Sequence, residues 1–187
     1  YASVVVVSYL YFDRAIATFF YQLDTRNTFS FLRWLTVLGE SKIYIGVFLI
    51  MALFFRLINP NKKYEGQFLY MLGCVLIAAL SILVLKMVLG RARPDLLFSE
   101  GKYGFYWLAF DRPYWSFPSG HAVTVTSLAC GLSVLIPRYF SMFLSLAILV
   151  ILTRIALYQH YLSDVMTGFY LGILIVGFFT EFLKKIG

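Results

Sequence analysis

Long apolar runs, separated by short polar or charged stretches, fill most of this sequence. A helix needs about 20 mostly apolar residues to cross the hydrocarbon core of a bilayer, which is about 30 Å thick. Glycine, proline and charged residues bound the runs, as they bound helices. The pattern predicts five complete membrane-spanning helices, over residues 43–58, 67–89, 118–136, 139–158 and 160–182. The first of these extends back to Leu38 if the apolar residues before it belong to the same helix.

The N-terminal residues leave two interpretations open. As a helix, residues 1–12 would be about 18 Å long at 1.5 Å per residue, which is too short to span. They are either the end of a first spanning helix whose start precedes Tyr1, or part of a span that continues to Phe20. They lack the basic n-region and cleavage site of a signal peptide. Charged and aromatic residues mix from Asp13 to Trp34, which predicts an interfacial helix and loop.

The longest polar segment, residues 90–117, is too long to be a simple connection. The order of the predicted helices brings the ends of 67–89 and 139–158 to one membrane face, together with the starts of 118–136 and 160–182. No repeat and no strand pattern is present. We therefore expect an all-α fold: an integral membrane bundle of about six transmembrane helices with an interfacial helix, forming one domain over all 187 residues.

Composition supports a membrane protein. The chain is 61% hydrophobic and 13% charged, whereas soluble domains are roughly half apolar. Its net charge of +7 comes without a contiguous basic tract, so nucleic-acid binding is excluded. The positive side chains are expected to meet anionic lipid head groups and a phosphate. Cys74 and Cys130 lie inside apolar runs, where small thiols serve as packing residues.

The stretch Phe117-Pro118-Ser119-Gly120-His121 opens the predicted helix 118–136. Proline suits the first turn of a helix, because its missing N–H would have no partner there. The backbone N–H groups of Ser119 and Gly120 would then lie at a helix N-terminus, where anions bind. His121 adds a side chain that titrates near neutral pH. Taken alone, the stretch equally fits a helix start with an incidental histidine.

Three basic residues are predicted at the same membrane face. Lys86 lies near the end of one spanning helix, Arg93 follows it in the loop, and Arg154 lies near the end of another. Lys86 alone would fit a lysine whose ammonium group reaches the interface, and Arg93 an ordinary interfacial arginine. Arg154 lies within an apolar run, where ionisable residues are costly and usually functional.

His160 and Asp164 are four residues apart and would share one helix face, with the carboxylate next to the imidazole. The chain has only two histidines, and His121 is predicted at the same face. Three cations beside a helix N-terminus suit a phosphate group, because phosphoryl transfer needs stabilisation of charge on three oxygens. One histidine, oriented by Asp164, would attack phosphorus, and the other would protonate the leaving oxygen.

These residues resemble a known family. Lys86-x6-Arg93-Pro94, Pro118-Ser119-Gly120-His121 and Arg154-x5-His160-x3-Asp164 are similar, in order and spacing, to the three signature motifs of the type 2 phosphatidic acid phosphatase (PAP2) superfamily. The resemblance implies a phosphate site made by Lys86, Arg93, Arg154, Ser119 and the Gly120 N–H. It also implies that His160 is the nucleophile, held by Asp164, and that His121 is the general acid and later the base. The family needs no metal, and we expect none and no cofactor. Thr153 stands where the family commonly has serine, which affects only a minor hydrogen bond.

We therefore expect a membrane lipid phosphatase that removes a terminal phosphate through a phosphohistidine. Its candidate substrates are phosphatidylglycerol phosphate, undecaprenyl diphosphate, phosphatidic acid and lipid A 1-phosphate. The loop before Pro118 resembles that of the lipid A 1-phosphatase group. The aromatic residues of this loop, 103–107, fit an interfacial belt better than a surface for acyl chains. A lipid phosphotransferase of the same superfamily is an alternative, and a channel or transporter with buried charges is a weaker one.

We further expect the bacterial inner membrane as the location, with the site facing away from the cytoplasm. The connections on the opposite face are short and carry lysine and arginine, which favours the cytoplasmic side for them. The expected partners are the lipid phosphate substrate and the bilayer, with no nucleic acid and no obligate protein partner.

Overall fold

The structure, a computed structural model, describes residues 1–186. These residues form helices and their connections, and the only strand-like pairing among them is an isolated bridge between Arg91 and Phe105. The helices are α1 Ala2–Val7, a π-helical turn Ser8–Phe12, α2 Asp13–Gln22, α3 Thr25–Thr28, α4 Phe31–Val37, α5 Ser41–Leu57, α6 Lys62–Leu89, α7 Pro94–Glu100, α8 Gly120–Leu135, α9 Phe140–Ala156 and α10 Leu162–Ile186, with 3-10 turns at Arg112–Tyr114 and Pro137–Tyr139.

The bundle confirms the predicted all-α membrane fold. Four helical segments are long and apolar enough to cross a bilayer: Ala2–Gln22, Lys62–Leu89, Pro137–Ala156 and Leu162–Ile186. The pair α4 and α5, bent by 43° at residues 38–40, makes a fifth if it counts as one span. The predicted span 118–136 is the shorter apolar helix α8, which has 16 residues and is about 24 Å long at 1.5 Å per residue. It is therefore shorter than the hydrocarbon core. The PSGH motif lies at its start, with Pro118 and Ser119 before the helix and Gly120 and His121 in its first turn.

The N-terminal helix decides between the two interpretations left open by the sequence. Its helical conformation continues from Ala2 through the π-helical turn to Gln22. The prediction of an interfacial segment starting at Asp13 is therefore wrong at its N-terminal end. Asp13 is fully buried and pairs with Arg91 inside the bundle, so its charge does not force the chain out to the interface. Only the short helices α3 and α4 and the connections around them remain as candidates for an interfacial segment.

Local sequence explains the ends of α6, the longest helix. Asn61 caps its start, because its side chain accepts hydrogen bonds from the N–H groups of Lys63 and Tyr64. This cap starts the helix at Lys62, five residues before the predicted boundary. Gly90 ends it in a left-handed conformation with φ +56° and donates its N–H to the carbonyl of Lys86 at 3.0 Å.

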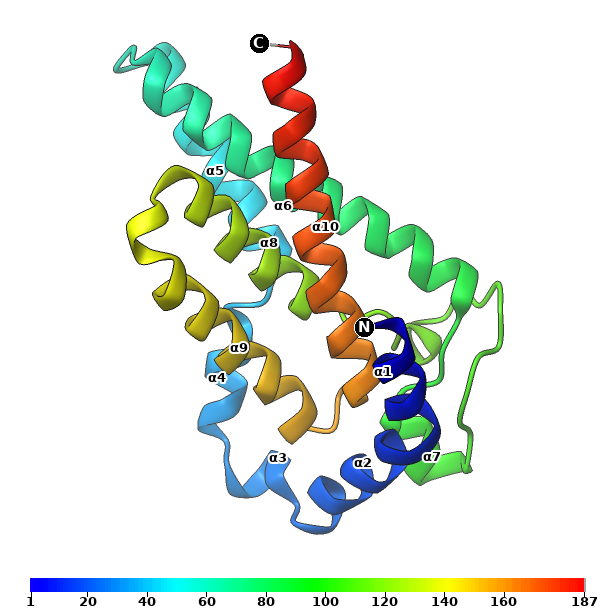
Figure 1. The fold of residues 1–187 in the computed structure, drawn as a ribbon. Coiled ribbons are helices and arrows are strands. Elements are labelled where there is room, and N and C mark those ends of the chain that lie inside the picture. Colours follow the sequence, from blue (N-terminus) through cyan, green and yellow to red (C-terminus); the bar gives the residue numbers. More distant parts are fainter. Residues whose placement is uncertain (187) are drawn as a thin grey trace.

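Helix α8 lies at the centre of the bundle, between α6, α9 and α10 (Figure 1). Nine of its 16 residues are buried. Gly168 and Gly172 of α10 let the two helices meet closely, as small residues do in membrane bundles. A Cβ at Gly168 would lie 2.7 Å from the carbonyl oxygen of Ser119, and one at Gly172 would lie 2.7 Å from the Cβ of Thr126. The start of α10 is thereby held against the start of α8.

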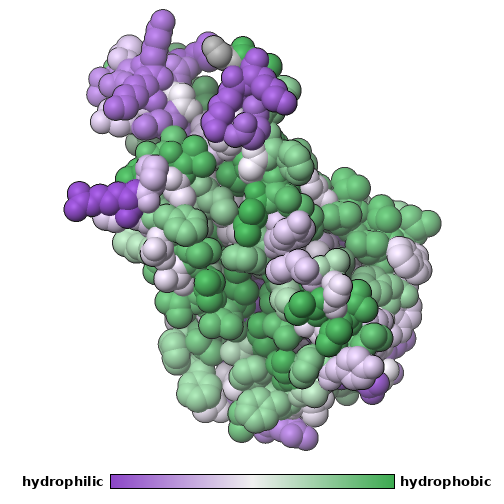
Figure 2. Space-filling view, in the orientation of Figure 1, coloured by the Kyte–Doolittle hydropathy of each residue, from purple (hydrophilic) through white to green (hydrophobic). Residues whose placement is uncertain are grey.

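The bundle has two polar ends, one at the α5–α6 turn and the other where the predicted catalytic residues lie. The α5–α6 turn and the C-terminus share one end, where Figure 2 shows hydrophilic side chains above a largely apolar surface. The end of α6, the end of α9 and the starts of α8 and α10 lie away from that end (Figure 1). The predicted grouping of these four helix ends is therefore confirmed, and it is where the predicted catalytic residues lie.

Candidate active site

The start of α8 differs in detail from its prediction. Ser119 is the N-cap, with its Oγ accepting from the N–H of Ala122 at 3.4 Å, so Pro118 precedes the helix instead of filling its first turn. The N–H of Ser119 donates to the carbonyl of Asp164 at 3.0 Å, and Ser119 is fully buried. Ser119 thus joins α8 to α10, and its part in binding phosphate stays a prediction. Gly120 lies beside Lys86: a Cβ there would be 3.7 Å from Lys86 Cε.

Lys86 and Arg93 meet at one backbone oxygen. Lys86 Nζ donates to the carbonyl of Trp115 at 2.6 Å, and Arg93 Nη2 approaches the same oxygen at 3.5 Å. The loop carries this carbonyl to them, because Arg93 N–H donates to the Pro113 carbonyl and Ser116 N–H to the Arg91 carbonyl, both at 3.0 Å. The end of α6 and the folded loop therefore hold two cations together.

Arg154 reaches the site from the last turn of α9. Its side chain is buried, and its Nη1 donates to Thr36 Oγ1 of α4 at 2.7 Å. Its Nε is buried and has no hydrogen-bond partner in the described residues, as is also true of Arg93 Nε. Each arginine thus keeps a donor that an anion could use.

His160 lies in the connection between α9 and α10, two residues before α10 begins, and not on the helix itself. The predicted pairing with Asp164 is nevertheless present as a near contact: His160 Nδ1 is 3.5 Å from Asp164 Oδ2. That separation is longer than a normal hydrogen bond. The end of α9 fixes the backbone, since the N–H of His160 donates to the carbonyl of Arg154 at 3.3 Å.

His160 is buried among the site charges. Burial lowers the pKa of His160 well below its ordinary value; Asp164 opposes this effect, and Arg93, Lys86 and Arg154 strengthen it. The three cations therefore act on one imidazole, which is neutral at physiological pH in the absence of substrate. A neutral imidazole has the lone pair that a nucleophile needs.

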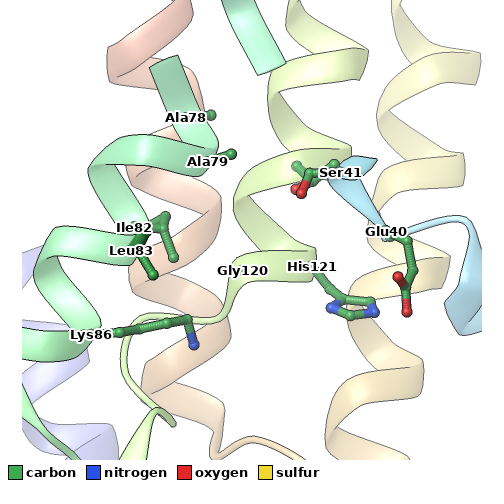
Figure 3. Close-up of a pocket in the computed structure, with 11 residues that line it drawn as sticks. Glu40, Ser41, Ala78, Ala79, Ile82, Leu83, Lys86, Gly120 and His121 are labelled. Atoms are coloured by element: carbon green, nitrogen blue, oxygen red, sulfur yellow. The ribbon is translucent and has the colours of Figure 1, made fainter. Parts of the chain in front are cut away.

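A cavity of about 260 Å³ opens between α6, α8 and the start of α5. Lys86 of α6 and His121 of α8 both line this cavity, and Figure 3 shows Gly120 between them and Glu40 beyond the imidazole. Gly39 forms the wall against His121: a Cβ on Gly39 would lie 2.4 Å from His121 Cδ2. The bend between α4 and α5 therefore packs on the predicted general acid.

The sequence did not single out a second set of buried polar residues. Arg91 and Asp13 are fully buried and form a salt bridge with Nη2 to Oδ2 at 2.7 Å, and Arg91 also pairs with Asp164. Ser116 donates to Asp164 Oδ2 at 2.6 Å, and Ser163 accepts from Arg91 Nη1 at 2.7 Å. The available signal was Asp13 itself, since an acidic residue within an apolar run is rarely incidental.

Within residues 1–186, no three His, Cys, Asp or Glu side chains come together as a metal site would need. The expectation that no metal takes part stays a prediction.

Comparison with known proteins adds the family. The sequence model of the PAP2 superfamily matches residues 67–187 of the chain. The lipid A 1-phosphatases of Rhizobium etli and Rhizobium johnstonii are each 36% identical to it over 103 residues, which is 55% of this chain. Those residues make up 44% and 42% of the two relatives, so the chain spans less than half the length of either.

The fold has a solved counterpart. It is similar to the crystal structure of a transmembrane PAP2-type phosphatidylglycerolphosphate phosphatase from Bacillus subtilis, with a TM-score of 0.59 and 20% identity over 94% of this chain and 86% of that one. At this identity the likeness concerns the fold alone. The family match covers most of the sequence and contains all eight residues predicted for the site. The chain is thus an integral membrane protein that belongs to the PAP2 superfamily.

Proposed function

We propose that this chain is a metal-independent lipid phosphate phosphatase that works through a phosphohistidine at His160. One observation carries the proposal. The charges of Lys86, Arg93 and Arg154 all act on His160, yet among residues 1–186 none of the three forms a salt bridge with a carboxylate. Buried charges without a counter-ion are costly. A phosphate dianion supplies the missing charge, and arginine forks match its oxygens.

The two histidines divide the chemistry. Asp164 faces His160 Nδ1, so it favours the tautomer with the proton there and leaves the lone pair on Nε2. Nε2 attacks phosphorus, the bond from phosphorus to the lipid oxygen breaks, and His121 gives that oxygen its proton. His121 then takes a proton from water, which attacks phosphorus as the bond to Nε2 breaks. The three cations hold the phosphoryl oxygens through both steps.

For the substrate, the curated relatives favour lipid A 1-phosphate, because both are named lipid A 1-phosphatases. The other candidates are phosphatidylglycerol phosphate, undecaprenyl diphosphate and phosphatidic acid. We place the protein in a bacterial inner membrane with the site away from the cytoplasm. The opposite end carries basic residues in a short connection and in the end turns of helices: Arg56, Lys62, Lys63, Arg138, Lys184 and Lys185. This charge favours the cytoplasm for that end.

A phosphate-release panel tests this proposal. Purified protein in detergent and excess chelator is offered each of the four lipids, with His160→Gln as the inactive control. We expect release of inorganic phosphate, fastest from lipid A 1-phosphate, and inhibition by vanadate. Loss of all activity in chelator would contradict the metal-independent mechanism. Transfer of the phosphate to a second lipid, seen by chromatography without release, would identify a phosphotransferase instead.

A further inference from the structure

Arg91 is the largest fully buried side chain among the described residues. Its side chain is fully buried, with its guanidinium carbon 4.9 Å from the ring centre of Tyr9 and 4.4 Å from that of Tyr161. One nitrogen, Nη1, donates to Ser163 Oγ at 2.7 Å and to Asp164 Oδ1; the other, Nη2, donates to Asp13 Oδ2 at 2.7 Å. A single guanidinium therefore connects the N-terminal helix with the first turn of α10.

Asp13 completes this connection from the other side. Its Oδ1 accepts from the N–H of Ser163 at 2.9 Å, and its Oδ2 accepts from the hydroxyl of the same serine. The carboxylate lies one residue after the π-helical turn Ser8–Phe12. Asp13 thus holds the residue directly before Asp164 by its backbone and its side chain.

The contacts of Asp164 are divided between its two oxygens. Oδ1 accepts a hydrogen bond from Arg91. Oδ2 accepts hydrogen bonds from the hydroxyl of Ser116 at 2.6 Å and from the N–H of Tyr161 at 2.9 Å, and it lies 3.5 Å from His160 Nδ1. With these partners the carboxylate has no freedom to rotate away from the imidazole. Its orientation, and hence that of His160, depends on the guanidinium behind it.

We propose that Asp13 and Arg91 are positioning residues for the nucleophile: together they fix Asp164 and keep a net negative charge behind His160. The inference rests on the proposed role of His160. Arg91 between two carboxylates leaves a cluster with one net negative charge. With Arg91 and Asp164 alone the cluster would be neutral, so Asp13 preserves the charge that stabilises His160 as it becomes positive during attack on phosphorus.

If Asp13 acts through its charge, its removal changes the pH dependence of phosphorylation; if Asp13 only supports the structure, it does not. The charged groups with the largest direct effect on His160 are Asp164 of α10, Arg154 of α9, Lys86 of α6 and Arg93 of the loop, and all four are unchanged in Asp13→Asn. Removing the negative charge disfavours the imidazolium, so the pKa of His160 falls further. The acid limb of the phosphorylation rate then moves to lower pH, while the plateau rate drops because the nucleophile is less basic. A structural defect would reduce the fraction of active protein without moving the limb.

The experiment uses an aryl phosphate and rapid mixing. The phenolate leaves without a proton, so the burst of phenol measures phosphorylation of His160, and its amplitude counts active sites. For Asp13→Asn we expect a plateau rate about tenfold lower, with the acid limb shifted to lower pH by about half a unit to one unit. Ser163→Ala removes the bridging hydroxyl but no charge, so its limb should not move. Arg14→Gln, an exposed neighbour of Asp13, should match wild type.

Two outcomes overturn the inference: a wild-type rate and limb in Asp13→Asn, or the same limb shift in Ser163→Ala. If Asp13→Asn does not fold, Asp13→Glu serves instead. It keeps the charge but displaces the guanidinium, so the plateau should fall several-fold with the limb in place, and an unchanged plateau overturns the positioning role. A wild-type protein that releases phosphate from neither the aryl phosphate nor any of the four lipids would instead contradict the proposed function itself.

Discussion

Gly39→Ala is a sharp test of how the bend between α4 and α5 supports His121. The backbone at Gly39 is not in the left-handed region, so alanine adds bulk without backbone strain. The new Cβ would lie 2.4 Å from His121 Cδ2 and 2.8 Å from both Cγ and Cβ of the same side chain. Turning the imidazole relieves the first two contacts but not the third, because Cβ is fixed to the backbone of α8.

The structure gives the size of the effect. Carbon atoms pack at about 3.5–4.0 Å, so the imidazole and the first turn of α8 must move away by about 1 Å. A displacement of that size in a catalytic group costs on the order of 100-fold in rate. We expect the loss in the step that needs the proton from His121, which is departure of the lipid oxygen.

The assay compares two substrates. Gly39→Ala should lose about 100-fold in turnover of a lipid phosphate, which needs a proton on its leaving oxygen. It should keep a normal phenol burst with an aryl phosphate, which does not. Gly46→Ala is the matched control, because a Cβ at that position of α5 meets nothing within 4 Å. Wild-type turnover of the lipid by Gly39→Ala, or an equal loss of the burst, would refute the reasoning.

Three further predictions concern the phosphate site, stability and sidedness. Arg154→Lys should lower kcat/KM for a lipid phosphate by about 100-fold, because the point charge of lysine does not replace the two-pronged contact of arginine with the phosphoryl oxygens. Thr36→Val removes only the hydroxyl partner of Arg154 and should lower kcat/KM a few-fold. Wild-type activity in Arg154→Lys would contradict the role of Arg154 in binding phosphate. His160 stays neutral in the folded protein since burial lowers its pKa, so below about pH 6.5 the unfolded chain binds one more proton, and the free energy of unfolding should fall by up to about 1.4 kcal/mol per pH unit. The unfolding midpoints of wild type and His160→Gln, measured in one detergent, should therefore converge as the pH falls from 8 to 5. Parallel curves would contradict a neutral His160. A cysteine placed by Lys62→Cys in a variant without Cys74 and Cys130 should resist an impermeant thiol reagent in intact cells and react after lysis, whereas ready labelling in intact cells would reverse the proposed orientation.

The sequence predicts much of this molecule because the bilayer enforces simple rules. A long apolar run must become a helix, so the cores of α6, α9 and α10 followed from pattern alone. The order of these helices fixes which helix ends meet. It therefore predicted that Lys86, Arg154 and His160 lie at one end of the bundle. Boundaries were less certain where single side chains decide them, as Asn61 does by capping α6.

The remaining features depend on contacts between distant residues. Asp13 looked like the start of an interfacial segment, because nothing in its neighbourhood reveals that Arg91, far along the chain, neutralises it. The wall that Gly39 makes for His121 is equally invisible, since a glycine at a bend usually serves the backbone rather than a neighbouring ring. Such pairings arise from tertiary packing, for which a single sequence carries no periodic signal.

The most decisive measurement locates the phosphate on the protein. His121→Ala is mixed with an aryl phosphate, quenched in base and analysed by mass spectrometry of its peptides. We predict a burst of one phenol per enzyme, then a stall, with acid-labile phosphate on His160. His160→Ala should show neither burst nor label, and Asp164→Ala should acquire the label slowly. Label on His121 in His160→Ala, with none in His121→Ala, would reverse the two roles, and the absence of any phosphohistidine in these proteins would contradict the mechanism.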